Sequence, residues 1–118
     1  MNFTVETSDV ADAEIDAAYF RLSARNPEFA GRWLEGVYRT IDTLSLFPTR
    51  HARVAESDVL GREVRRMLYR NGRTVYRILF TLIDADGDGE ADTVRVLRVL
   101  RVRHGAQQSL GQPTEDDV

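Results

Sequence analysis

Thr74–Ile83, TVYRILFTLI, and Thr93–Val102, TVRVLRVLRV, are the two stretches that decide the fold. Both are dense in β-branched and aromatic residues, which is typical of strands. A third strand is predicted over Glu63–Tyr69, because Asn71-Gly72 behind it is a strong hairpin-turn signal. Three consecutive strands joined by short connections predict a three-stranded antiparallel meander.

The sequence before the meander predicts one strand and two helices. Phe3–Glu6 alternates apolar and polar residues, as a short strand does. Helical spacing then runs over 11–25, with Ser8 or Asp9 as the cap, and restarts at Asn26-Pro27 until Pro48 stops it. The short connection predicts an antiparallel helical hairpin. Residues 49–60 show no period and are expected to form a loop, so the fold class is α+β with the N-terminal strand and the meander in one sheet.

The composition indicates one compact domain. A chain of 118 residues buries about two-thirds of its unfolded surface, and we expect a single domain over 1–106 followed by a polar, flexible tail over 107–118. Cysteine is absent, which excludes disulfides and thiolate metal sites. No apolar run reaches the roughly 20 residues that cross a bilayer. The start, MNFTVETSD, lacks the order of a signal peptide, so we expect a cytoplasmic protein that makes no membrane contact.

Charge is distributed unevenly along the chain. All 16 basic residues are arginines, and the net charge is −3. The stretch Asp84–Asp92 carries −5 and the acidic residues of the tail carry −3, so the remainder carries +5. An arginine-rich body suits phosphate or an acidic protein partner, although arginines also serve simply as solvated surface.

The connection DADGDGEAD, Asp84–Asp92, partly matches a calcium loop. Asp84, Asp86 and Asp88 fit ligand positions 1, 3 and 5, Gly89 fits position 6 and Asp92 fits position 9. Position 12 requires a bidentate acid but falls on Arg95, and the flanks are strands instead of helices. We therefore interpret the stretch as an acidic hairpin loop, with weak calcium binding by the four aspartates as the alternative and no cofactor expected.

Arg77 is the most informative charged residue of the meander. Strand alternation puts it on one face with Val75 and Leu79, while Tyr76, Ile78 and Phe80 share the other. A guanidinium in an apolar strand is costly unless it meets solvent, a carboxylate or an anion. Two interpretations stay open: a structural ion pair, or a cation presented to phosphate.

Four segments in order resemble the RelE/ParE superfamily of bacterial toxin–antitoxin toxins, which includes plasmid-stabilisation proteins. They are AEIDAAYF in the first helix, the spacing from Ala30 through Trp33, Val37, Ile41 and Leu44 to Pro48, the strand Tyr76–Phe80, and Val102–Gly105. The resemblance covers about residues 3–106. It implies an α+β domain with the helical hairpin on one sheet face, and a cognate antitoxin that wraps the toxin into a hetero-oligomer.

The family implies two different targets. A RelE-like member would cut messenger RNA at the ribosome. Arg77 would then stabilise phosphate, His104 would act as an acid, and Arg65 would add a cation, with Arg66 and Arg70 on the same strand. A ParE-like member would inhibit DNA gyrase by protein contact, without catalysis. Because RVRHG resembles ParE-like members and the net charge is acidic, we favour gyrase. A non-toxic, partner-binding relative is the third alternative.

Overall fold

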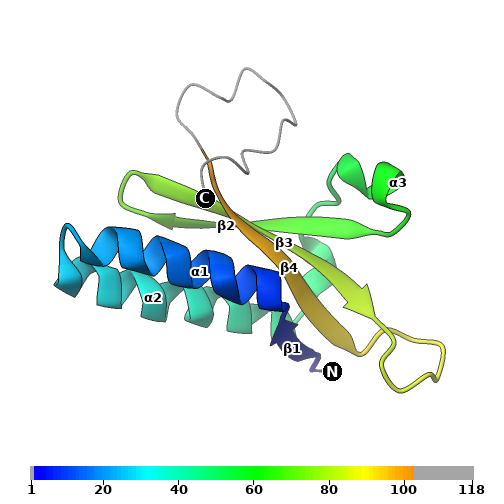
Figure 1. The fold of residues 1–118 in the computed structure, drawn as a ribbon. Coiled ribbons are helices and arrows are strands. Elements are labelled where there is room, and N and C mark those ends of the chain that lie inside the picture. The colour runs from blue at the N-terminus through cyan, green and yellow to red at the C-terminus, as the bar shows by residue number, and fades with distance from the viewer. Residues whose placement is uncertain (1, 103–118) are drawn as a thin grey trace.

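The computed structural model describes residues 2–102, and in these residues two helices lie against one face of a single sheet (Figure 1). The strands are β1 (Thr4–Thr7), β2 (Val64–Asn71), β3 (Thr74–Ile83) and β4 (Thr93–Val102), in the spatial order β1-β4-β3-β2. The pairs β2–β3 and β3–β4 are antiparallel, while β1 pairs with β4 in parallel. The predicted α+β class and the antiparallel meander are therefore confirmed. The expected division between a domain over 1–106 and a tail lies largely outside the described residues.

The helical hairpin consists of α1 (Asp9–Ser23) and α2 (Pro27–Asp42). At the start of α1 the Ser8 hydroxyl accepts from the Ala11 amide at 3.0 Å, and at the start of α2 the Asn26 side chain accepts from the Phe29 amide at 3.1 Å. Pro27 follows at the first helical position, where its missing N–H costs nothing. The predicted caps are thus the observed ones. After Asp42 the chain tightens into the 3₁₀ turn η1 (Thr43–Ser45).

The prediction of a loop over 49–60 was wrong at both ends of this range and correct for residues 51–55. This segment contains the 3₁₀ turn η2 (Pro48–Arg50) and the short helix α3 (Glu56–Leu60). The Ser57 hydroxyl donates to the Val64 carbonyl at 2.9 Å and accepts from the Val64 amide at 2.8 Å, which fastens α3 to the start of β2. A five-residue helix is too short to show a hydrophobic period in the sequence. The position of α3 depends instead on its hydrogen bonds with β2.

The core lies between the helical hairpin and the sheet. Ile15 from α1 and Trp33, Val37 and Ile41 from α2 pack with Tyr76, Ile78 and Phe80 of β3 and with Val94, Val96 and Val99 of β4. Gly36 allows α2 to lie close to the Tyr69 side chain of β2, because a Cβ built at Gly36 would lie 2.1 Å from the Tyr69 hydroxyl oxygen. That hydroxyl donates to the Trp33 carbonyl at 3.2 Å, so the second helix and β2 are in direct contact.

An irregularity in β4 changes which residues face the helices. The pairing of β3 with β4 shifts between Leu79, opposite Arg98, and Phe80, opposite Val96, so Leu97 is the extra residue of a β-bulge. Strand β1 ends opposite Val96. Beyond Val96, the Glu14 side chain of α1 replaces β1 as a partner of the β4 backbone and accepts from the Val99 amide at 2.7 Å. The helix therefore closes the part of the β4 edge that β1 leaves uncovered.

Candidate functional site

The face of the sheet opposite the helices carries a regular alternation of arginines and aliphatic residues. Cross-strand partners share a face, and register aligns Arg66 with Leu79 and Arg98, Leu68 with Arg77 and Leu100, and Arg70 with Val75 and Val102. We call these nine residues the outer face. Leu68 is 42% exposed and Arg66 and Arg70 are exposed, whereas Leu100 is buried. The outer face therefore offers guanidinium groups separated by apolar surface.

Arg77 lies in the middle of the outer face and is half-buried. The prediction that it shares a side with Val75 and Leu79, away from the core residues of β3, is confirmed. Arg66 and Arg70, which the ribonuclease alternative already groups with it, lie on the same face, as does Arg98, which the sequence did not connect with Arg77. The register of the strands and the bulge at Leu97 bring them together.

Arg98 is anchored to the helical layer. Its Nε donates to Glu14 Oε2 at 2.7 Å, while the other carboxylate oxygen of Glu14 accepts from the Val99 amide. Glu14 is only 8% exposed, so one nearly buried carboxylate satisfies both a backbone donor and a guanidinium. Arg98 is accordingly a positioned part of the outer face.

Arg65 does not join Arg77. It pairs with Phe80 across the sheet and so lies on the helix-facing side. Its guanidinium donates to the carbonyls of Thr49, at 3.1 Å, and His51, and forms an ion pair with Glu63. The structure thus gives this arginine the role of holding the 49–51 segment against β2. His104, the other residue predicted for a ribonuclease site, lies outside the described residues.

His51 lies beside Arg65 in this segment. Its ring packs edge-to-face on Phe80, with the ring centroids 5.9 Å apart. Burial, followed by the charges of Arg50 and Arg65, lowers its pKa below 6.5. These surroundings favour the neutral form of the ring over the protonated one.

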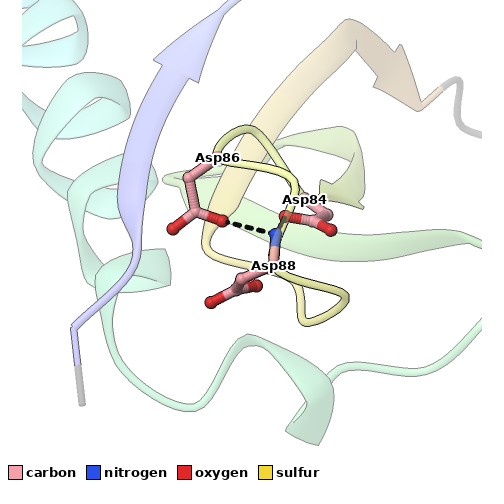
Figure 2. Close-up of side chains that lie close together, drawn as sticks. All are labelled: Asp84, Asp86 and Asp88. Atoms are coloured by element: carbon pink, nitrogen blue, oxygen red, sulfur yellow. Dashed lines mark hydrogen bonds between the residues drawn. The ribbon is translucent and has the colours of Figure 1, made fainter.

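The acidic loop between β3 and β4 is organised by its own carboxylates. Figure 2 shows Asp84, Asp86 and Asp88 close together, and one carboxylate oxygen from each lies within 4.8 Å of the others. Asp84 accepts from the amides of Gly87, Asp88 and Gly89, the shortest at 2.7 Å. Asp92 accepts from the amides of Ala85 and Asp86, both at 3.1 Å. Most of the backbone amides of the loop that donate hydrogen bonds therefore donate them to two carboxylates, those of Asp84 and Asp92.

These hydrogen bonds change the pKa values of the aspartates in the loop. The Gly89 amide and then that of Gly87 lower the pKa of Asp84, and the Thr93 hydroxyl and the Ala85 amide lower the pKa of Asp92. The Asp88 amide lowers the pKa of Asp86, but partial desolvation and the neighbouring carboxylates outweigh it, so that pKa is raised. Within this cluster, the ionised form is therefore favoured at Asp84 and Asp92 and disfavoured at Asp86.

The geometry limits the loop as a calcium site. Arg95, at the position of the bidentate acid, is bound to Glu6 of β1 through its Nε at 2.5 Å. The oxygens of Asp84 and Asp92 already accept backbone hydrogen bonds. These contacts favour the hairpin-loop interpretation, and calcium binding stays a prediction to be tested.

The comparisons with known proteins confirm the type of fold. No family model matches this sequence, and no curated protein matches it. Among solved structures, a chain of the chromosomal ParDE TA system from P. aeruginosa superposes with a TM-score of 0.64. The match covers 86% of this chain and 97% of that chain, at 20% sequence identity. This chain therefore shares its fold with that ParDE-system chain. Among the described residues, no helix is long and apolar enough to span a bilayer.

Proposed function

We propose that this chain is the toxin of a type II toxin–antitoxin module, that it inhibits growth by binding DNA gyrase, and that a cognate antitoxin neutralises it. The observation that carries the first part is the likeness over almost the whole chain to a ParDE protein. The antitoxin would be encoded by a small neighbouring gene, and the two proteins would form a hetero-oligomer.

The outer face supports binding over catalysis. Cleavage of RNA by its own 2′-hydroxyl requires a base and an acid. The nine described residues of the outer face are arginines, leucines and valines. Arginine stays protonated at any physiological pH, so it can stabilise a phosphate but cannot transfer the proton. A face of this composition suits a docking surface for a macromolecule.

Ribosome-dependent RNA cleavage is the second candidate. Arg77 favours it, because four arginines interleaved with aliphatic residues also suit phosphate. Under this alternative Arg77 would stabilise the transition state, and His104 would supply the acid. The gyrase proposal assigns neither residue a catalytic role.

Induction of the protein in a bacterial host separates the candidates. Gyrase inhibition should arrest growth, relax plasmid DNA and induce the DNA-damage response, and co-expression of the neighbouring gene should restore growth. Cleaved messages in a translation assay, abolished by Arg77→Ala, would establish the ribonuclease instead. Normal growth at a verified level of folded protein would leave a non-toxic, partner-binding relative.

A further inference from the structure

One end of the molecule concentrates positive charge away from both the acidic loop and the centre of the outer face. We call it the basic end: Arg21, Arg25, Arg32, Arg70, Arg73 and Arg101. These residues come from the last turn of α1, the helix connection, α2, the end of β2, the β2–β3 turn and the end of β4. Figure 1 shows the helix connection and the β2–β3 turn at the same end, with the acidic loop at the opposite end.

Contacts in the core fix these elements next to one another. Trp33 of α2 lies against Tyr76 of β3, with ring centroids 5.1 Å apart, and against Tyr69 of β2 at 6.3 Å. Tyr76 pairs directly with Arg101. Burial raises the pKa of the Tyr76 hydroxyl, while the nearby Arg21, through charge and a hydrogen bond, and Arg101 lower it. The guanidinium groups of Arg21 from α1 and Arg101 from β4 therefore lie near the Tyr76 hydroxyl.

In the described segments around the basic end, arginines outnumber acidic side chains. Residues 20–36 and 69–76 hold five arginines and two glutamates, Glu28 and Glu35, which leaves a net charge of +3. All six arginines except Arg21 are exposed, and Phe20 beside it is 77% exposed. Clustered guanidinium groups that project from several elements, with an exposed aromatic ring among them, are typical of surfaces that bind nucleic acid.

We propose that the basic end binds the phosphate backbone of duplex DNA. The choice of DNA rests on the proposed function, because gyrase acts on duplex DNA and a bound inhibitor lies next to it. Arginine forms bidentate contacts with phosphate oxygens, and neutralising phosphates releases counterions, which makes binding strongly dependent on salt. The −5 charge of the loop at the far end would orient the protein with the basic end toward the duplex.

Fluorescence anisotropy with a labelled duplex of roughly 20 base pairs tests the proposal on the full chain, without gyrase. The test variant is Arg25→Gln/Arg32→Gln/Arg73→Gln, which leaves the outer face intact. The matched control, Arg50→Gln/Arg53→Gln/Arg62→Gln, removes the same charge around η2 and α3. Urea midpoints establish that both variants are folded.

The test variant should bind at least about tenfold more weakly at low salt, and its salt slope should fall by about 0.9 for each phosphate that is no longer neutralised. The control should bind like the unmodified chain. No binding of DNA by the unmodified chain at low salt would overturn the proposal, as would equally weakened binding in the two variants or tighter binding to single-stranded RNA. Gyrase activity is not measured here, so DNA binding without gyrase inhibition would refute the proposed function and leave this inference intact.

Discussion

Substitution of Gly36 by alanine tests the packing of α2 on the sheet. A Cβ at this position would lie 2.1 Å from the hydroxyl oxygen and 3.0 Å from Cζ of Tyr69. Relieving that overlap requires the ring or the helix to move. The movement would disturb the hydrogen bonds that the Tyr69 hydroxyl donates to Trp33 and accepts from Asn71. Gly36→Ala should therefore destabilise the fold although alanine favours helix.

The expected change in the free energy of unfolding on Gly36→Ala is the sum of opposing effects. Overpacking a tight contact costs about 1–3 kcal/mol, and each disturbed hydrogen bond costs about 1 kcal/mol. Alanine in a helix interior returns about 1 kcal/mol relative to glycine. We expect a net destabilisation of about 2–4 kcal/mol, measured as a lower midpoint in urea unfolding at an unchanged slope.

The same helix supplies a control. At Gly31 a Cβ would meet no neighbouring atom within 4 Å, so Gly31→Ala should stabilise the protein by about 0.5–1 kcal/mol. Removing the hydroxyl with Tyr69→Phe should reduce the cost of Gly36→Ala by about 1 kcal/mol or more. Equal effects of alanine at the two glycines, or a cost unchanged by Tyr69→Phe, would refute the close approach of helix and ring.

Three further predictions concern titration and ions. The pKa of His51 is lowered on folding, so the unfolded chain binds the proton more readily and stability should decrease as pH falls through 6.5; the difference between urea curves at pH 5 and pH 8 should be smaller in His51→Gln. In NMR titrations Asp84 and Asp92 should titrate below 3.8 and Asp86 above it, and a uniform midpoint for the three would contradict the hydrogen-bonded loop. Calorimetry with calcium at about millimolar concentration, a range typical of weak sites, should give no saturable heat; a saturable isotherm that Asp84→Asn abolishes would establish the site that we disfavour.

The sequence predicts the architecture because its local signals agree with one another. The caps at Ser8 and Asn26, the proline at 27 and the β-branched runs of β3 and β4 all indicate the elements that form. The parallel pairing of β1 with β4 depends on distant contacts and has no local pattern. The same is true of α3, whose position depends on the hydrogen bonds of Ser57 with Val64.

The candidate site is less predictable than the fold. Alternation alone places Arg77 correctly, because it requires only the period of one strand. Grouping it with Arg66 and Arg98 requires the register between strands and the bulge at Leu97. Alternation also separates Arg65 from Arg66, but only the register with β3 shows which of the two shares a face with Arg77.

A supercoiling assay with purified gyrase tests whether this chain inhibits the enzyme. Relaxed plasmid, gyrase and ATP are incubated with increasing amounts of the folded chain, and supercoiled product is measured on a gel. We expect a dose-dependent decrease in supercoiling that the purified antitoxin reverses. Full supercoiling at a large excess of the chain, together with messenger RNA cleavage on ribosomes that disappears in Arg77→Ala, would contradict it.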